Sequence, residues 1–435
     1  MPCPECNQED NGYWCKPCNS KHLQNDFNNW TSGNDKIDKL IQDAQLNANY
    51  NWEVIEWIPY DRFKDVKQIG KGGFGTIHYA RWIDGFIEAW DIENQQWKRH
   101  EDEEVALKKF DNFVNFNDVL NEMAIHLNTN GNGSIRFYGI TQDPETHSYM
   151  MVLKYASGNL REYLKNNFNN INWYQKLDNL YYLSSRLMSI HKLDIVHQDF
   201  HPGNILSSNF KRNMQISDFG LSKIIGANPN NPEKKNIFGV LPYIAPEVLS
   251  GEEYTKAADV YSFGIIAYEM VTGFPPYPDI PHDKDLAMKI CNGLRPKIPF
   301  HIPKLITRMI MRCWDARVTY RPTFEELKDE LLKYYDDYCR YLEDRKNKDS
   351  EIVIQIKKAE EFSENQESTN TTTTTPLNYQ THPQAIYTSR LLNYSKLPKP
   401  KNEENFEREL EELTKFTSAL SIGDSGIVDL DMSNF

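Results

Sequence analysis

Three polar residues in one part of the chain have the types and spacing of a site that handles a nucleotide phosphate. Asp199 is followed five residues later by Asn204 and nineteen residues later by Asp218. An aspartate in the first position could orient an acceptor hydroxyl and take its proton late in a transfer. The oxygens of Asn204 and Asp218 are hard ligands of the kind Mg²⁺ prefers, and such sites leave room for phosphate oxygens and water. This stretch therefore predicts phosphoryl transfer from a magnesium-bound nucleotide.

A glycine-rich run upstream could approach the phosphates of that nucleotide. Gly70, Gly72 and Gly75 stand at its first, third and sixth positions, shortly before Ile77. Because glycine has no Cβ, a hairpin backbone can come close to phosphate oxygens at these positions. An ordinary β-turn has the same composition, so this run alone leaves both interpretations open.

The strand-like run 105–108 ends in Lys108, and a second lysine, Lys109, follows it. Neighbouring side chains of a strand point to opposite faces, so only one of Lys108 and Lys109 can face the nucleotide. The apolar residues over 115–128 have helical spacing and predict a helix that carries Glu122.

The surrounding patterns indicate which elements position these residues. Strand signals dominate from Phe63 to Tyr155, with one helical interruption, and helical signals dominate from there to Leu332. A polar insert over 84–103, rich in tryptophan and charge, predicts a long exposed hairpin. An amphipathic helix is expected over 34–48, upstream of the strands.

Several motifs occur in a recognisable order over about 270 residues. They include the run 195–206, the triplets 218–220 and 245–247, the run 259–264 and the late Arg321. Together with the glycine-rich run and Lys108, they resemble the motifs of eukaryotic protein kinases. The residue sequence from Asp199 to Asn204 is most similar to that of the tyrosine-kinase-like group. The resemblance implies an α+β, bilobed fold with a β-rich N-lobe and an α-helical C-lobe. It also implies ATP and Mg²⁺ as cofactors and protein substrates, with serine or threonine acceptors in most members of the group.

The resemblance assigns a role to each motif residue. Lys108 would hold the α- and β-phosphates and pair with Glu122, so Lys109 would be solvated. Asp199 would be the catalytic aspartate, and Asn204 and Asp218 would bind Mg²⁺. The implied nucleotide-binding residues are Gly70, Gly72, Gly75, Ile77, Ala106, Lys108, Leu153, Tyr155 and Ala156, the last two in a hinge over 154–156.

The resemblance also implies supporting contacts. Glu247 would pair with Arg321, and Asp259 would support the backbone of the catalytic loop. A buried stack between the lobes would contain Phe137, His126, Phe219 and His197.

The chain departs from the kinase pattern in the segment expected to control activity. Gln198 replaces the arginine that usually precedes the catalytic aspartate, and glutamine cannot form a charge-assisted bidentate pair with a phosphate. The segment 221–244 contains only two hydroxyl residues, Ser222 and Tyr243. We infer that activity does not depend on phosphorylation of this segment.

Two further departures concern the acceptor. His201 stands where serine/threonine kinases usually carry lysine, and Val240 stands where they usually carry threonine. Serine/threonine specificity is therefore a group-level expectation. The alternative is a pseudokinase scaffold that binds partners through its head and tail, although all the catalytic residues are present.

Four of the seven cysteines lie within the first eighteen residues. Cys3, Cys6, Cys15 and Cys18 form two C-x-x-C pairs separated by eight residues, which predicts a zinc-ribbon-like head with one tetrahedral Zn²⁺. The alternative is a disordered head with reactive thiols. Such a head joined to such a kinase resembles an expanded kinase group of fungi.

Composition limits the remaining possibilities. The net charge is −13, of which −7 lies after residue 335, and this argues against a nucleic-acid surface. The chain has no apolar run long enough for a membrane span and no apolar segment typical of a signal peptide, so we expect a cytoplasmic or nuclear protein with regulatory partners that the sequence does not identify. We divide it into a zinc-knuckle head (1–20), a helix and linker (21–62), a kinase domain (63–332) and a charged, largely disordered tail (333–435). Within the tail, we expect a charged helical stretch to about Glu364 and a short helix over 403–412.

Overall fold

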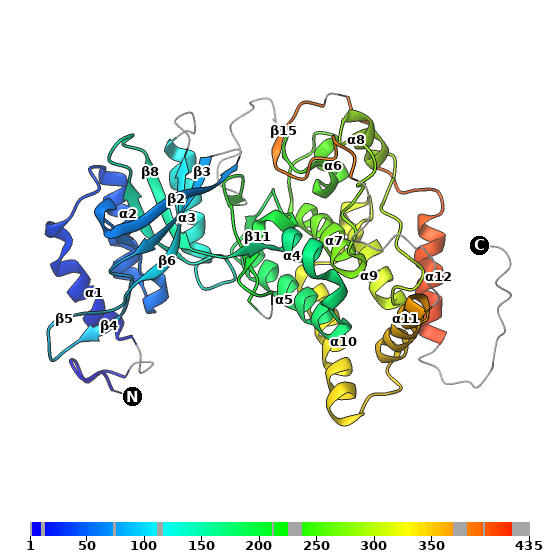
Figure 1. The fold of residues 1–435 in the computed structure, drawn as a ribbon, viewed down its shortest axis with the longest axis horizontal. Coiled ribbons are helices and arrows are strands. Elements are labelled where there is room, and N and C mark those ends of the chain that lie inside the picture. The colour runs from blue at the N-terminus through cyan, green and yellow to red at the C-terminus, as the bar shows by residue number, and fades with distance from the viewer. Residues whose placement is uncertain are drawn as a thin grey trace.

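A six-stranded sheet is the centre of the N-terminal lobe in the computed structural model, which describes residues 2–9, 14–72, 75–110, 116–210, 213–224, 237–368, 381–394 and 396–419. In spatial order the strands are β1 (Glu56–Trp57), β7 (Phe137–Gln142), β8 (Tyr149–Lys154), β6 (Glu103–Phe110), β3 (Gly75–Trp82) and β2 (Phe63–Gly72). Strand β1 runs parallel to β7, and all the other neighbours are antiparallel. The helical C-terminal lobe lies beside this sheet (Figure 1), which confirms the α+β, bilobed fold.

The two faces of the sheet belong to different apolar clusters. Val105 and Leu107 of β6 are fully buried on one face, against Trp82. The other face, with Met151 of β8, packs against helix α3 (Phe116–Thr129). Alternation along β6 directs Lys108 away from the face of Leu107 and therefore toward α3.

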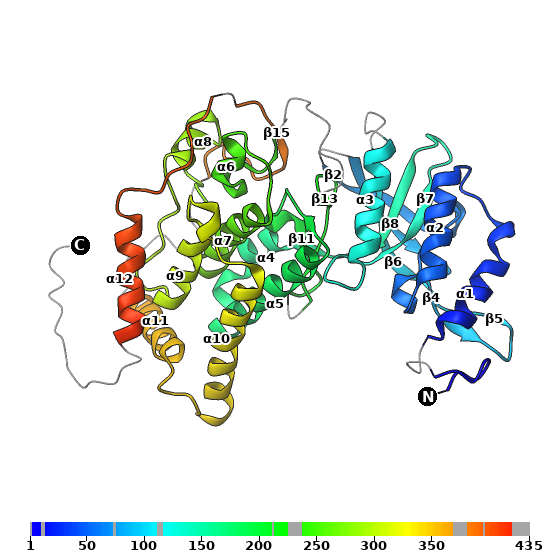
Figure 2. The same ribbon diagram turned by 180° about the vertical axis from the view of Figure 1, so that it is seen from behind.

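Helix α2 (Asp35–Asn47) lies outside α3 and packs against it (Figure 2). Its N-terminus is capped by the side chain of Asn34, which accepts hydrogen bonds from two backbone N–H groups. Its fully buried Ile37 and Ile41 join the apolar cluster of α3 and β7. The helices predicted over 34–48 and 115–128 are both confirmed.

The polar insert forms the predicted hairpin, with strands β4 (Phe86–Asp91) and β5 (Gln96–His100). One side of it is covered by the N-terminal segment, including helix α1 (Lys16–Asn25). His22 stacks on Trp90 with ring centroids 3.9 Å apart, and Trp14 stacks on Trp97 at 5.9 Å. The hairpin is thus less exposed than the sequence suggested, because side chains of the N-terminal segment pack on its tryptophans.

Most of the C-terminal lobe is helical. Its α-helices up to residue 344 are α4 (Leu160–Asn167), α5 (Trp173–Lys192), the short α6 (Pro246–Leu249), α7 (Lys256–Thr272), α8 (Lys284–Cys291), α9 (Lys304–Cys313) and α10 (Phe324–Asp344). Its short strands are β9 (Gly158–Asn159), β10 (Ile195–Val196), β11 (Ile205–Ser207), β12 (Gln215–Ile216), β13 (Lys223–Ile224) and β14 (Ile237–Gly239). Helix α7 is buried along almost its entire length, as expected of the central helix of a lobe. No helix among the described residues is long and apolar enough to cross a membrane.

The helices expected to about Glu364 and over 403–412 are confirmed, but the described residues after 332 are more ordered than a largely disordered tail. They form the end of α10, helix α11 (Glu351–Ser368), strand β15 (Arg390–Leu392) and helix α12 (Phe406–Ala419). Ile352, Val353 and Ile356 of α11 are buried in the core of the C-lobe. The described part of the tail is ordered because its charged sequence still contains apolar residues that pack against the C-lobe. The threonine run 371–375 lies outside the described residues.

Candidate active site

Lys108 is shared by two carboxylates from different parts of the fold. Its ammonium group donates a hydrogen bond to Glu122 of α3 and lies 2.8 Å from Asp218 Oδ1, in the segment after β12. Lys108 and Glu122 are buried, and the side chain of Asp218 is 39% exposed. Gly220 packs closely against this cluster, because a Cβ there would lie 3.2 Å from Glu122 Oε2.

The charges of this cluster stabilise one another. Burial alone would lower the pKa of Lys108, but Asp218 and Glu122 raise it, so the amine is a cation at neutral pH. Burial alone would raise the pKa of Asp218, but the charge and the hydrogen bond of Lys108 lower it to about 2. Burial raises the pKa of Glu122, and Lys108 opposes that shift.

Lys109 was expected to be solvated, and this prediction is wrong. Its amine lies 2.6 Å from Asp143 Oδ2, and its side chain is only 22% exposed. The strand alternation itself is confirmed, since Lys109 and Lys108 point to opposite faces. The sequence offered no signal for Asp143, which lies just beyond the end of β7.

Asp199 and Asn204 lie in the turn between β10 and β11 and are held together. Asn204 Nδ2 donates to the carbonyl oxygen of Asp199 at 3.0 Å, which leaves Asn204 Oδ1 as its ligating atom. Ser217 links this turn to Asp218, because its backbone N–H donates to the carbonyl oxygen of Asn204 at 2.9 Å. The three residues that the sequence singled out are therefore brought together by one short backbone connection.

His201 adds a second group beside Asp199. Its Nδ1 accepts a hydrogen bond from the Gly203 N–H at 3.0 Å, and its Nε2 lies 3.6 Å from Asp199 Oδ1. That Nε2 is buried and has no hydrogen-bond partner among the described residues. A buried polar atom in this position could serve a ligand.

Asp259 of α7 supports the catalytic loop, as predicted. It accepts hydrogen bonds from the backbone N–H groups of His197 at 2.9 Å and Gln198 at 3.2 Å, and it also contacts His191 Nε2 at 2.9 Å. Gln198 has a left-handed backbone (φ 68°), which these bonds stabilise. The orientation of Asp199 thus depends on a buried carboxylate from another element.

The predicted stack between the lobes is confirmed. The ring of His126 lies 6.1 Å from Phe137 and 4.9 Å from Phe219, and His197 lies 5.0 Å from Phe219. All four side chains are fully buried. Burial lowers the pKa of His126 to about 3 and also lowers the pKa of His197, so both are neutral at pH 7.

The residues expected to bind the nucleotide lie on adjacent strands. Ile77 of β3 pairs with Lys108 of β6, and Ala106 of β6 pairs with Leu153 of β8. Leu206 of β11, which the sequence analysis missed, packs with Leu153 in the same apolar cluster. The remaining predicted residues occupy the ends of β2 and β3 (Gly70, Gly72, Gly75) and the segment after β8 (Tyr155, Ala156).

Gly75 has a packing role of its own. A Cβ there would collide with the carbonyl oxygen of Lys109, so only glycine allows β3 to pair so closely with β6 at this point. Residues 73 and 74 at the tip of the glycine-rich run lie outside the described residues.

Both hydroxyl residues of the segment 221–244 are buried. Ser222 Oγ donates to the carbonyl oxygen of His197 at 2.8 Å, and 2% of Ser222 is exposed. Tyr243 donates to Glu269 Oε2 at 2.5 Å and accepts from Arg161 at 2.8 Å. Each hydroxyl therefore has a structural partner and is shielded from solvent.

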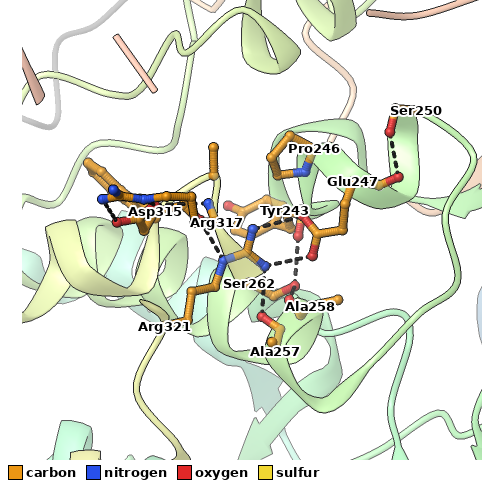
Figure 3. A network of polar contacts seen from close by, with 12 residues as sticks. Tyr243, Pro246, Glu247, Ser250, Ala257, Ala258, Ser262, Asp315, Arg317 and Arg321 are labelled. Carbon is orange, nitrogen blue, oxygen red and sulfur yellow. Dashed lines mark hydrogen bonds and ion pairs between the residues drawn. The ribbon is translucent and has the colours of Figure 1, made fainter. Parts of the chain in front are cut away.

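A buried ion pair joins the end of this segment to the base of the C-lobe (Figure 3). Arg321 donates to both oxygens of Glu247, at 2.6 and 2.7 Å, as predicted, and also to the carbonyl oxygens of Ala257 and Asp315. Ser262 donates to the carbonyl oxygen of Tyr243 at 2.7 Å. The network is fully hydrogen-bonded, which such a buried charge pair requires.

The four cysteines of the head also come together. The sulfurs of Cys3, Cys6, Cys15 and Cys18 all lie within 4.8 Å of one another. The distance between sulfurs is 3.8 Å for Cys3 and Cys18 and 3.6 Å for Cys6 and Cys15. None of them forms a disulfide.

Comparison with known proteins agrees with this geometry. The chain is 30% identical over 302 residues to a protein of Acanthamoeba polyphaga mimivirus named as a serine/threonine-protein kinase/receptor. This alignment covers 68% of this chain and 17% of that protein. The chain is 27% identical over 276 residues to the tyrosine-protein kinase SPK-1 of Girardia tigrina (61% of this chain, 52% of that protein). It is 38% identical over 148 residues to the dual specificity protein kinase shkE of Dictyostelium discoideum (33% and 20%).

The matched region thus spans from about a sixth to about half of the length of these relatives. The family model described as protein tyrosine and serine/threonine kinase matches residues 63–331, which include every element of the site described above except the cysteine cluster. The chain belongs to the protein tyrosine and serine/threonine kinase family.

Proposed function

We propose that this chain transfers the γ-phosphoryl group of ATP to serine or threonine hydroxyls of proteins. The observation that carries the proposal is Lys108, which is held between Glu122 and Asp218 beside the linked pair Asp199 and Asn204. This arrangement supplies one cation for phosphates, two oxygen ligands for a metal and one carboxylate for an acceptor hydroxyl.

Membership of the family implies ATP and Mg²⁺, and the donor set fits them. Asp218 is ionised and partly exposed, and Asn204 keeps its amide oxygen available. These two residues would hold Mg²⁺, which when bound neutralises the negative charge on the phosphates. Lys108 would orient the α- and β-phosphates.

Asp199 and His201 would act on the acceptor side. Asp199 would orient the acceptor hydroxyl and take its proton late in the transfer. The buried Nε2 of His201, 3.6 Å from Asp199 Oδ1, would donate a hydrogen bond to the transferred group. Histidine would then replace the lysine that is usual in serine/threonine kinases.

A test compares two neighbouring lysines. The purified chain, Lys108→Met and Lys109→Met are incubated with labelled ATP, Mg²⁺ and a generic protein substrate, beside Asp218→Ala. We expect Lys108→Met and Asp218→Ala to lose roughly a hundredfold or more in kcat, as when one preorganised charge is removed from a polar site, and Lys109→Met to keep most of its activity. Equal incorporation of label by all four chains would contradict the proposal and favour the scaffold. Phosphoamino-acid analysis of the product then tests the acceptor.

We also propose that the four cysteines hold one Zn²⁺. A tetrahedral ion with bonds of about 2.3 Å to sulfur places its ligands about 3.8 Å apart, close to the 3.8 and 3.6 Å between the paired sulfurs. The ion would fix the turn over residues 3–6 to the start of α1.

Metal analysis tests the zinc site. We expect one zinc per chain in the purified protein, strongly reduced zinc in Cys6→Ser, and unchanged zinc in Cys339→Ser, since Cys339 lies far along the chain in α10. Absence of zinc from the unaltered chain, expressed with zinc in the medium, would contradict the site.

The substrates proposed are proteins, and a cytoplasmic or nuclear location is proposed with them. The support for the location is the cysteine usage, with all seven thiols free in the structure. Imaging of a tagged chain would test it.

A further inference from the structure

The tail returns to the side of the molecule where Asp199 lies. Strand β15 pairs antiparallel with β14, with Arg390 opposite Gly239 and Leu392 opposite Ile237 (Figure 1, where β15 is the orange strand). These two strands form a separate sheet among the described residues. We call residues 381–394 the docked tail.

Strand β14 borders the catalytic aspartate directly. A Cβ on Gly239 would lie 3.3 Å from Asp199 Oδ1, so the end of β14 is in contact with that carboxylate. Continuing the antiparallel register by one residue places Ser389 opposite Val240. The Oγ of Ser389 is buried and has no hydrogen-bond partner in the described structure. The docked tail therefore runs along the strand next to the catalytic centre.

The docked tail is held by specific contacts, and most of them converge on His282. The Nδ1 of His282 contacts the carbonyl oxygen of Ile386 at 2.9 Å, and Arg390 donates to the carbonyl oxygen of His282. The hydroxyl of Tyr387 donates to the carbonyl oxygen of Pro276 at 2.8 Å. Leu392 is 3% exposed within the C-lobe core.

A second contact connects the docked tail to the segment that carries β14. The guanidinium of Arg161 lies 4.6 Å from the centre of the Tyr387 ring and donates to the hydroxyl of Tyr243. Tyr243 lies 6.3 Å from His201, ring to ring. The tail thus covers a continuous surface from α8 to the residues beside Asp199.

An exposed strand edge is a general site for extended peptides, because its free N–H and C=O groups pair with the backbone of any partner. The edge of β14 is such a site, and its position beside Asp199 suits a peptide that carries the acceptor hydroxyl. In this chain, the edge is already occupied by a segment that lies beyond residue 331, where the family match ends.

We propose that the docked tail is an internal competitor of the acceptor protein, because it occupies the edge of β14 that an extended acceptor peptide would use. This inference rests on the proposed function, because it concerns how an acceptor protein reaches Asp199 and which segment competes with it. An acceptor protein must displace the docked tail before its hydroxyl reaches Asp199.

The proposal predicts competition that is specific for the acceptor. A tethered segment competes at a high effective concentration, so releasing it should lower the apparent KM for an acceptor peptide roughly tenfold or more. The KM for ATP should not change, because the contacts described above join the docked tail to β14, Arg161 and the segment before α8, and not to the strands expected to bind ATP.

Two adjacent leucines provide a matched pair of variants. Leu392→Asp places a charge at a buried position and should release β15, whereas Leu391→Asp alters a side chain that is 41% exposed on the same strand. Kinetics with a generic acceptor peptide should show the lower KM in Leu392→Asp alone. A KM equal to that of the unaltered chain in a folded Leu392→Asp would overturn the proposal.

A binding experiment does not depend on catalysis. A fluorescent peptide with the sequence of residues 384–394 is titrated into each chain, and its anisotropy is measured. It should bind Leu392→Asp and bind the unaltered chain and Leu391→Asp much more weakly. Equal binding to all three would overturn the proposal. Selective binding without phosphorylation by any chain would support the docked tail and contradict the proposed kinase activity.

Should Leu392→Asp fail to fold, as judged by its melting curve, Arg390→Ala replaces it. That variant loses the hydrogen bond to the His282 carbonyl oxygen and the contact of Arg390 with Tyr394. The Arg390→Ala chain should bind the peptide of residues 384–394 more tightly than the unaltered chain does, although by a smaller margin than Leu392→Asp. If a folded Arg390→Ala chain binds the peptide no more tightly than the unaltered chain, the proposal is overturned.

Discussion

At the scale of residues, the charge of Lys108 determines how the site is organised. Its two carboxylate partners come from α3 in the N-lobe and from the segment after β12 in the C-lobe. Lys108 can therefore contact both carboxylates only when the two lobes have the relative position seen in this structure. Loss of either carboxylate would leave a buried charge with one partner, which is costly.

Ser222 gives a prediction at this scale. Ser222→Ala removes one hydrogen bond to the His197 carbonyl oxygen and should cost about 1 kcal/mol of unfolding free energy, while kcat stays close to that of the unaltered chain. Urea unfolding and the peptide assay measure the two quantities. Abolished activity in a folded Ser222→Ala chain would show that phosphorylation of this residue is needed after all.

His126 gives a prediction about pH. Its pKa is about 3 in the folded chain and about 6.5 when unfolded, so the unfolded state takes up the proton first as the pH falls. Between pH 6.5 and about 3, this histidine should therefore lower the free energy of unfolding by up to about 1.4 kcal/mol per pH unit. Above pH 6.5, it should have no effect.

The variant His126→Met isolates this contribution. Stability measured by urea unfolding at several pH values should fall less steeply on acidification than in the unaltered chain. His147→Asn, in an exposed turn, is the control and should keep the steeper slope. Identical slopes for all three chains would contradict the assignment.

Sequence spacing was sufficient to find the residues of the site but not all of their partners. Lys108, Asp199, Asn204 and Asp218 could be found because each belongs to a motif with a fixed offset, and Glu122 could be found from its place on a predicted helix. Asp143 beside Lys109 and Leu206 beside Leu153 have no such offset. Their positions follow from how whole strands are placed, which local patterns do not encode.

At the scale of elements, α2 is the support of α3. Fully buried Ile41 packs in the cluster that includes Val119 and Met123, on the same helix as Glu122. Helical periodicity predicted both helices, but periodicity marks an apolar face without saying what covers it. The contact therefore had to come from the structure.

Ile41→Ala tests this support. It should cost roughly 2–5 kcal/mol of stability, as for other buried isoleucines, and lower kcat/KM at temperatures where the chain is still folded, because α3 holds Glu122 less firmly. Lys39→Ala, 75% exposed on the same helix, should stay within about 0.5 kcal/mol. Thermal melts and the peptide assay provide the measurements. Equal effects of the two variants would contradict a role for α2.

At the scale of the whole molecule, segments outside the matched region 63–331 complete both lobes. The head and α2 cover the N-lobe, and the C-lobe core includes Tyr334 and Tyr338 of α10 as well as residues of α11. The composition of the tail suggested disorder, since charge dominates it. A few apolar residues at helical spacing were enough for the C-lobe to order it.

A chain shortened to residues 63–331 should therefore be much less stable than the full chain. Each buried aliphatic side chain lost from the tail removes about 1.5–3 kcal/mol, against a total of roughly 5–15 kcal/mol for a typical domain. We expect its melting temperature to fall by more than about 10 °C. A chain that ends at Ala419 keeps every described contact and is the control; similar melting of all three chains would contradict the prediction.

The stacking of the head on the β4–β5 hairpin has a consequence for how this chain changes over evolution. His22 lies 68 residues before Trp90 in the sequence, and Trp14 lies 83 residues before Trp97, on which it stacks. A substitution on either side opens a gap that only a change on the other side can close. In close relatives, the head and the hairpin should therefore be inherited or lost as a pair, even where the strands between them stay the same.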